Sequence, residues 1–265
     1  MKTISYEDIY TRNAGYFSDI EIERIKKLKV AIAGAGGLGG PVAYILARLG
    51  VGEIRIADPE EFEPSNINRQ YGANIKTIGR NKAKVIGEEI AIINPYMKVI
   101  SWDYGITEKN VAEFLKDADV VVDSIDFFKF TDARTLYREA EKNKQWIFTA
   151  QSAGSLFSVL IYKPGVTTFE KMFFKNDRVN VESAIKKCFP VLPKEATPEI
   201  LSEIIQGSVQ HVSSYASLPP IGGGILTNEI IKVFVKKSGP TAIAPNLYIV
   251  DVERMKITIF NNDSL

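Results

Sequence analysis

A glycine-rich stretch near the start of the chain most constrains its fold. The letters GAGGLG at positions 34–39 have the spacing G-x-G-x-x-G, and they stand between the apolar run KVAIA and the helix-length run PVAYILARL. In a strand-turn-helix unit, Gly34 permits the tight turn, Gly36 lets the backbone approach a phosphate, and Gly39 lets the helix pack close to the sheet. The stretch therefore predicts a nucleotide-binding turn.

The chain around this turn alternates short apolar runs with longer amphipathic ones, from Lys29 to Ala150. Short β-branched runs separated by segments of helical length are typical of a parallel sheet covered by helices. We expect an α/β fold with a Rossmann-like, doubly wound, mainly parallel sheet and helices on both faces. The late runs NLYIVDV and KITIF predict a hairpin, and hence a C-terminal antiparallel extension of the sheet.

No linker divides the chain, so we expect one domain over residues 1–265. Within it we distinguish an N-terminal helical arm (1–28), a nucleotide-binding core (29–150) and a second half (151–265). The prolines at 190, 193 and 198 predict a loop or short turns around residues 186–200. The later run GGGILTNEIIKVFVKK has apolar positions spaced for one face of a helix.

Composition excludes several classes of protein. Lys and Arg number 33 against 32 Asp and Glu, so no overall charge points to nucleic acid or an anionic membrane as a partner. The single cysteine, Cys188, excludes an internal disulfide and a cysteine-rich zinc site. No segment approaches ~18 consecutive apolar residues, so neither a membrane span nor a secretion signal is predicted. We expect a cytoplasmic protein.

An acid and two cations follow the glycine turn. Asp58 ends the second predicted strand, about 20 residues past the glycines, where a carboxylate can accept hydrogen bonds from both ribose hydroxyls. NAD and ATP both carry an adenosine ribose and phosphates, so this acid suits either. Arg69 and Lys82 could offset charge on a triphosphate, which hydride transfer would not require. Taken singly, each cation would more simply be a solvated surface charge.

The order of the motifs is more specific than any one of them. After GAGGLG and the acid come SNINRQ (65–70), GRNKA (79–83) and VVVDSID (120–126). This order resembles the ubiquitin-activating-like adenylating enzymes, the ThiF/MoeB/HesA superfamily, well over about Tyr10 to Ala150 and more loosely over ASLPPIGGGILTNEIIKVF. The resemblance implies ATP and Mg²⁺ as cofactors. It also implies attack of a carboxylate on the α-phosphate, giving an acyl-adenylate and pyrophosphate.

The resemblance also implies roles for the residues at matching positions. Asp58 would hold the ribose, Lys82 would neutralise charge between the α- and β-phosphates, and Asp126 would hold the magnesium ion. Asn66 and Arg69 would contact phosphates. The implied nucleotide-binding set is therefore Gly34, Gly36, Gly37, Gly39, Asp58, Asn66, Arg69 and Lys82.

Partners are implied in the same way. The usual substrate of the family is the C-terminal Gly-Gly of a small ubiquitin-fold carrier protein, and some members adenylate a peptide. Residues 151–265 would then bind the carrier and contain the crossover loop. The letters YTRN resemble the family's Tyr-x-Arg-Gln element, so Arg12 would reach into the partner subunit's site and the active unit would be a homodimer.

The chain departs from the family pattern at its cysteines. Many relatives carry a cysteine in the crossover loop, where this sequence has Ser213 or Ser214, and the structural zinc cysteines are absent. A serine needs a base to act as a nucleophile, and a role for His211 as that base is not predicted. Cys188, beside two lysines, is either a reactive thiolate in a mobile loop or a small buried hydrophobe. Phe127 stands where the family commonly has Asn.

These departures support adenylation without a cysteine relay. Two other functions remain open. An NAD(P)-dependent oxidoreductase would explain the glycines and Asp58, but it gives no role to Arg69, Lys82 and Asp126. A non-catalytic nucleotide-binding homologue would explain Phe127 and the missing cysteines.

Overall fold

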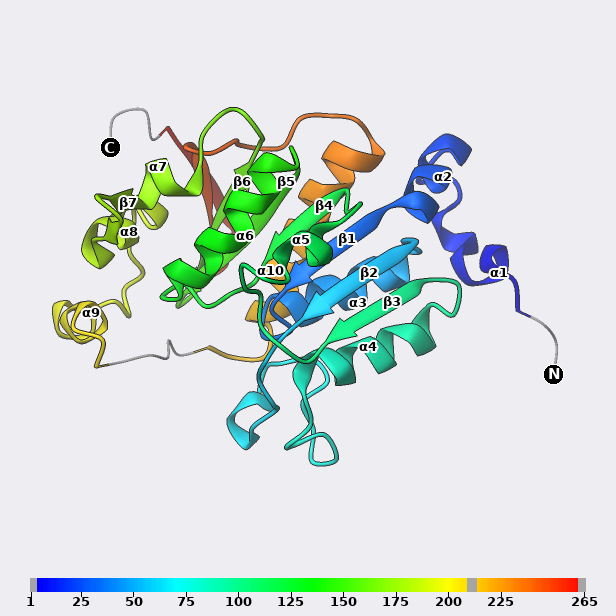
Figure 1. Cartoon of the computed structure of the whole chain (residues 1–265), viewed down its shortest axis with the longest axis horizontal. Helices are drawn as coiled ribbons and strands as arrows, with labels where there is room; N and C mark the ends of the chain where they lie inside the picture. Colours follow the sequence, from blue (N-terminus) through cyan, green and yellow to red (C-terminus); the bar gives the residue numbers. More distant parts are fainter. Residues whose placement is uncertain (1–3, 209–213, 262–265) are drawn as a thin grey trace.

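The computed structural model describes residues 4–208 and 214–261, and an eight-stranded sheet forms its centre (Figure 1). The strand order is β10-β9-β6-β5-β4-β1-β2-β3. The strands β1 to β5 pair in parallel, whereas β6, β9 and β10 join antiparallel. The sheet strands are β1 Lys29–Ala33, β2 Glu53–Ala57, β3 Lys98–Trp102, β4 Val120–Asp123, β5 Trp146–Ala153, β6 Leu156–Tyr162, β9 Leu247–Asp251 and β10 Lys256–Phe260. This arrangement confirms the mainly parallel sheet with an antiparallel extension.

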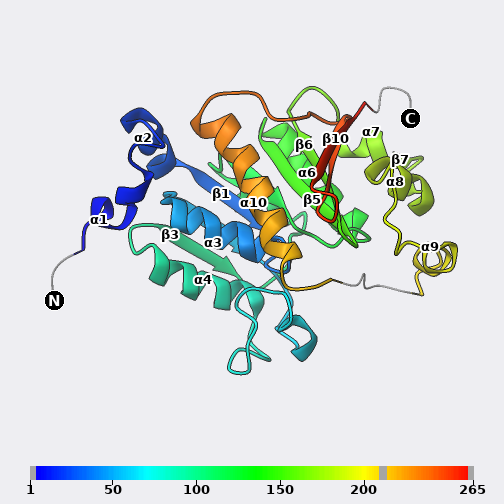
Figure 2. The same cartoon turned by 180° about the vertical axis from the view of Figure 1, so that it is seen from behind.

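Helices cover both faces of the sheet. In Figure 1 helices α5 and α6 lie in front of the strands, and in Figure 2, seen from behind, α3, α4 and α10 do. The helices are α1 Tyr6–Tyr10, α2 Asp19–Lys27, α3 Gly39–Leu49, α4 Lys82–Ile93, α5 Val111–Leu115, α6 Phe130–Lys142, α7 Phe169–Phe173, α8 Val181–Cys188, α9 Pro198–Ile205 and α10 Leu218–Ile230. A small ribbon of β7 (Phe174–Lys175) and β8 (Arg178–Val179) lies outside the main sheet. Within the described residues, no helix combines the length and apolar character needed to cross a bilayer.

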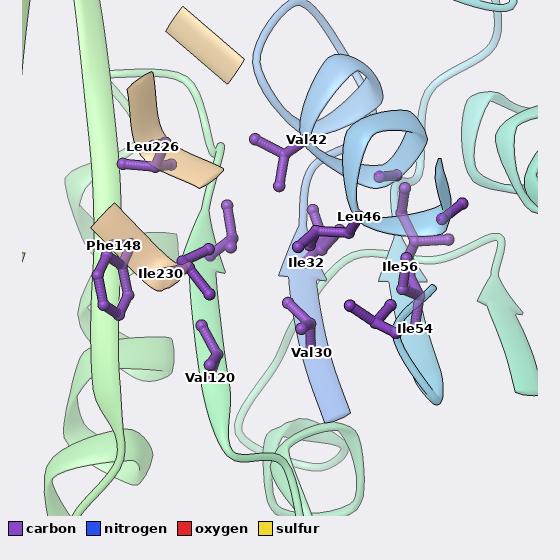
Figure 3. Close-up of a cluster of buried hydrophobic side chains, with 14 of the residues drawn as sticks. Val30, Ile32, Val42, Leu46, Ile54, Ile56, Val120, Phe148, Leu226 and Ile230 are labelled. Atoms are coloured by element: carbon purple, nitrogen blue, oxygen red, sulfur yellow. The ribbon is translucent and has the colours of Figure 1, made fainter. Parts of the chain in front are cut away.

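The core consists of two apolar layers, one on each face of the sheet. Successive side chains of a strand point to opposite faces. Val30 and Ile32 of β1 therefore pack with Leu46 of α3 and Ile230 of α10, in the layer shown in Figure 3. The alternate β1 residues are alanines and join the layer under α5 and α6. Because β1 is covered on both faces, its four residues after Lys29 are all apolar.

Two stretches differ from the sequence expectation. The proline-rich region contains the end of α8 and the start of α9, so only residues 189–197 lie outside helices there. Pro198 is the first residue of α9, where its missing N–H costs no hydrogen bond. Helix α10 begins at Leu218, before the glycines, and continues into a π-helical segment, Ile231–Val235.

The N-terminal arm binds the carboxyl end of α3. The hydroxyls of Tyr6 and Tyr10 donate to the carbonyls of Gly50 and Ala47, both at 2.8 Å. The Asn13 amide donates to the carbonyl of Leu49 at 2.9 Å. The arm therefore satisfies carbonyls that the last turn of a helix leaves free, at the end of α3 away from the glycine turn.

Candidate active site

The glycine turn connects β1 to α3. Gly34 has φ +101°, and a Cβ there would collide with the carbonyl of Ser124. A Cβ at Gly39 would collide with the carbonyl oxygen of Gly34, because α3 begins directly over the turn. Both positions therefore require glycine.

The middle of the turn is open. Gly36 and Gly37 are partly exposed, and the nearest neighbour of a Cβ at Gly36 would be the side-chain amide of Gln70, at 3.8 Å. Within the described part of the chain, the backbone N–H groups of Gly36, Gly37 and Leu38 have no hydrogen-bond acceptor. Three free donors at the start of a helix favour an anion, as a phosphate would be.

Asp58 follows β2 and joins the glycine turn to the next loop. Its Oδ2 accepts from the N–H of Ala35 at 2.7 Å, and its Oδ1 accepts from the N–H of Glu60 at 2.8 Å. Burial raises the pKa of Asp58, while these two donors act in the opposite direction. Each oxygen retains a further lone pair, so the carboxylate can still accept hydrogen bonds from a ligand.

The start of α4 is fixed against the same loop. The Asn81 side chain caps the helix through its Oδ1 and donates from Nδ2 to the Asp58 carbonyl at 2.7 Å. The backbone N–H of Lys82 donates to the Glu60 carbonyl at 2.9 Å. These bonds place Lys82, which is 5% exposed, beside the acid that ends β2.

Four charged side chains of alternating sign connect α4 to β4. The Lys82 ammonium binds Glu60 Oε2 at 2.8 Å, and the other oxygen of Glu60 binds Lys129 Nζ at 3.1 Å. Lys129 Nζ also lies 3.6 Å from a carboxylate oxygen of Asp126. Lys82, and then Lys129, lower the pKa of Glu60. The row Lys82, Glu60, Lys129 and Asp126 is called the charge row below.

The donor set suits a magnesium ion that is held largely by phosphates. Asp126 is the carboxylate at the exposed end of the charge row, with its side chain 72% exposed. Mg²⁺ usually binds one or two carboxylates together with substrate phosphates. Among the described residues there is no group of three or more His, Cys, Asp or Glu that could hold a metal alone.

The SNINRQ segment forms a turn beside the glycine turn. The buried Asn66 accepts from the N–H of Glu63 at 3.1 Å and so fixes the turn. Arg69 donates to the carbonyl of Ser65 at 3.0 Å and to Asn68 at 2.9 Å, and within the described residues it pairs with no carboxylate. The Oε1 of Gln70 is buried without a partner. The guanidinium of Arg69 can therefore meet a ligand anion without breaking an ion pair.

The site residues lie at the carboxyl ends of the strands where the order of strand addition reverses. They follow β1, β2 and β4, and β1 lies between the other two strands. The connection from β1 leads to β2 on one side, while β4 lies on the other. Ligands of open α/β sheets bind at the carboxyl ends of strands at such a point.

The model of the ThiF family matches residues 10–264. The chain belongs to the ThiF family. It is 26% identical over 246 residues to a sulfur carrier protein adenylyltransferase of Thermus thermophilus, covering 91% of this chain and 82% of that protein. It is 31% identical over 151 residues to a tRNA threonylcarbamoyladenosine dehydratase of Haemophilus influenzae, covering 57% of each.

Solved structures show the same fold. The structure of E. coli MccB with ATP superposes with a TM-score of 0.73 at 23% identity, over 96% of this chain and 70% of that one. A structure of PaaA gives a TM-score of 0.74 at 21% identity, over 98% and 75%. The Rossmann-like fold expected from the sequence is thereby confirmed.

Arg12 lies away from the site of its own chain. It is exposed in the 3₁₀ turn Thr11–Asn13, whose Asn13 binds the carboxyl end of α3, whereas the site lies at the amino end of that helix. In this ThiF-family chain Arg12 therefore does not contribute to the site of its own chain. Ser213 and His211 of the expected crossover loop lie outside the described residues, and the Ser214 carbonyl accepts from the Asn68 side-chain amide at 3.2 Å.

Cys188 is not the reactive thiol of a loop. It is the last residue of α8 and is 2% exposed, so the expectation of a mobile loop is wrong. Burial raises the pKa of the Cys188 thiol to about 12. A thiolate is therefore scarce at neutral pH, and the structure favours the small buried hydrophobe.

Phe127 belongs to an aromatic cluster at the start of α6. Its ring centroid lies 5.1 Å from that of Phe130 and 5.2 Å from that of Phe128. It is partly buried and packs against the apolar layer under α5 and α6. The Phe127 side chain therefore adds apolar packing to the turn next to Asp126.

The sequence reasoning missed Glu60 and Lys129. Glu60 lies two residues after Asp58, so its place near the site could have been inferred from the chain alone. Lys129 lies 69 residues further on, and only the pairing of the strands brings it to Glu60.

Proposed function

We propose that this ThiF-family protein is an ATP- and Mg²⁺-dependent adenylyltransferase that acts on the C-terminal carboxylate of a small ubiquitin-fold sulfur-carrier protein or peptide. The proposal depends on one observation: the glycine turn, with its free backbone N–H groups, is connected to the Lys82 ammonium through hydrogen bonds. The glycine turn offers free N–H groups, and Lys82 offers an ammonium. Asp58 connects the two, because it accepts from the N–H of Ala35 in the turn and from the N–H of Glu60, whose carboxylate binds Lys82. Such a site suits a nucleotide phosphate.

The reaction needs no nucleophile from the protein. A carboxylate oxygen of the substrate attacks the α-phosphorus of ATP, the bond from that phosphorus to its bridging oxygen breaks, and pyrophosphate leaves. The substrate carboxylate is already ionised at neutral pH. Lys82 and Arg69 offset the growing negative charge, Asn66 holds the turn that carries Arg69, and Asp58 accepts from the ribose. Asp126 would hold Mg²⁺ together with the phosphates, and the bound ion would supply further charge neutralisation.

The nature of the substrate rests on the relatives. The Thermus thermophilus protein is named for adenylating a sulfur carrier protein, and one E. coli MccB structure is described with both AMPCPP and the peptide MccA. A carrier ending in Gly-Gly or a peptide therefore suits this chain better than a free metabolite. The buried Cys188 supports release of the adenylate to a separate acceptor without a cysteine relay. We place the carrier on residues 151–265 and the reaction in a cytoplasmic homodimer.

The test is pyrophosphate exchange into ATP with candidate carriers that end in Gly-Gly. We expect exchange that depends on the carrier and falls by at least about a hundredfold in Asp126→Ala, because one charge-stabilising group is lost. Lys84→Ala is the control, because it removes an exposed lysine of the same helix as Lys82 that pairs with Asp103. Its exchange rate should stay within about twofold of the original.

The remaining alternatives give different results in the same assay. Tight NADH binding with no exchange for any carboxylate would contradict adenylation and favour an oxidoreductase. ATP binding with no exchange would favour the non-catalytic homologue. The family assignment and the charge row favour adenylation over both.

A further inference from the structure

Glu60 occupies the position at which Lys82 would meet a ligand anion. Lys82 is 5% exposed and its ammonium binds Glu60 Oε2 at 2.8 Å. Within the described residues Lys82 pairs with no other carboxylate. A buried ammonium without an anion is costly, so the Glu60 carboxylate stabilises Lys82. A phosphate that binds Lys82 must therefore compete with Glu60.

Lys129 holds the other oxygen of the same carboxylate. Its ammonium lies 3.1 Å from Glu60 Oε1, and the Lys129 and Glu60 side chains are 45% and 46% exposed. Both can therefore reorient in water, whereas Lys82 cannot. When a phosphate binds the Lys82 ammonium in place of Glu60, the Glu60 carboxylate still pairs with the Lys129 ammonium. Lys129 thus lowers the cost of releasing Lys82 to the nucleotide.

We propose that Glu60 and Lys129 are positioning residues that set the affinity of the site for nucleotide phosphates. Glu60 neutralises Lys82 before the nucleotide binds, and Lys129 retains Glu60 afterwards. The inference rests on the proposed function, since it assigns the phosphates of ATP to Lys82. It extends that function by giving roles to two residues that act through Lys82 rather than on the substrate.

Calorimetric titration of the full chain with ATP in the presence of Mg²⁺ tests the proposal. Glu60→Gln removes the competing charge and keeps the shape, so the dissociation constant should fall roughly three- to tenfold. Lys129→Ala directs the whole charge of Glu60 at Lys82, so the constant should rise by a similar factor. Lys129→Arg should restore the original value. In the double variant, Lys129→Ala should no longer weaken binding, because the loss of affinity passes through Glu60.

Adenosine is the matched ligand control, because it has no phosphate to compete with Glu60. Its affinity should not change in any of these variants, whereas a general distortion of the site would change both affinities. Lys84→Ala and Asp103→Asn remove the neighbouring exposed ion pair and should alter ATP binding by less than about twofold.

Three results would overturn the inference. One is weaker or unchanged ATP binding in Glu60→Gln. Another is an equal loss on Lys129→Ala with and without Glu60, which would mean that Lys129 contacts the phosphate directly. A third is a parallel change in adenosine binding. If the unaltered chain bound no ATP at all, the proposed function itself would fail, and this titration separates the two cases.

Discussion

Asp123 is a buried acid three residues before Asp126. Its Oδ1 accepts from the N–H of Ile125 at 3.0 Å, and its Oδ2 accepts from the Tyr137 hydroxyl at 2.9 Å. The adjacent Ser124 accepts from the N–H of Gly39 at 2.9 Å through its hydroxyl. This short segment therefore fixes the turn that presents Asp126 and attaches it to the start of α3.

The burial of Asp123 predicts a pH dependence of stability. Burial raises its pKa from 3.8 to about 6, so the folded protein binds this proton more readily than the unfolded chain does. The contribution of Asp123 is thus most favourable below about pH 4 and is lost as the pH rises through 6, by at most roughly 3 kcal/mol. Asp123→Asn cannot titrate and should lack this component.

Urea unfolding of both proteins between pH 4 and pH 7 measures the difference. The free energy of unfolding of the original chain, relative to Asp123→Asn, should decrease as the pH rises across this range. A constant difference between the two proteins would show that Asp123 keeps an ordinary pKa in the fold.

At the scale of elements, the contact between α10 and α3 supports the glycine turn. A Cβ at Gly223 would lie 2.7 Å from Cβ of Pro41 and 3.2 Å from the backbone nitrogen of Val42. The two helices therefore approach closely at the first turn of α3. The side chain of Pro219 lies near Gly37, because a Cβ built on Gly37 would be 3.9 Å from Cγ of Pro219.

Gly223→Ala should push α10 away from the start of α3. We expect a loss of about 1–3 kcal/mol in the free energy of unfolding and weaker ATP binding, because the free N–H groups would shift. Gly224→Ala is the matched control, since a Cβ there meets nothing within 4 Å. It should stabilise the helix by up to about 1 kcal/mol. Equal stability and ATP affinity in both variants would contradict the role of this contact.

The elements differ in how far the sequence could predict them. The alternation of KVAIA, EIRIA and VVVD with amphipathic runs predicted β1, β2, β4 and their covering helices, because short β-rich runs between helix-length segments are typical of a parallel sheet covered by helices. Helix α9 was missed because Pro198 indicates a break, although proline also suits a first helical turn. The glycine turn and Asp58 were predictable from local spacing. The pairing of Glu60 with Lys129 was not, because it depends on tertiary structure.

At the scale of the whole molecule, the position of Arg12 matters most. Arg12 is exposed on the arm at the carboxyl end of α3, while the glycine turn lies at the amino end of that helix. If Arg12 completes the site of the partner subunit, every active site combines residues from two chains. Arg12→Ala and Lys82→Ala would then each be inactive alone.

Mixing these two variants tests the shared site. After random exchange of subunits, half of the dimers contain one of each chain, and one of their two sites has both residues intact. About a quarter of the original pyrophosphate-exchange activity should therefore return. No recovery despite confirmed subunit exchange, or a monomer by light scattering, would contradict a role for Arg12 in the partner's site.

The antiparallel pairing of β6 with β9 closes a long segment of the chain, and the length of that segment has little effect on the free energy of folding. The chain leaves the sheet at Tyr162 and returns at Leu247, and α7, α8, α9 and α10 lie between. Doubling such an excursion adds only about 0.6 kcal/mol to the entropy cost of closing it. The glycine turn and the strands β1, β2 and β4 precede it in the chain and keep their register. Insertions in the loops around α7, α8 and α9 can therefore reshape this part of the surface at small cost to folding, provided that α10 keeps its contact with α3.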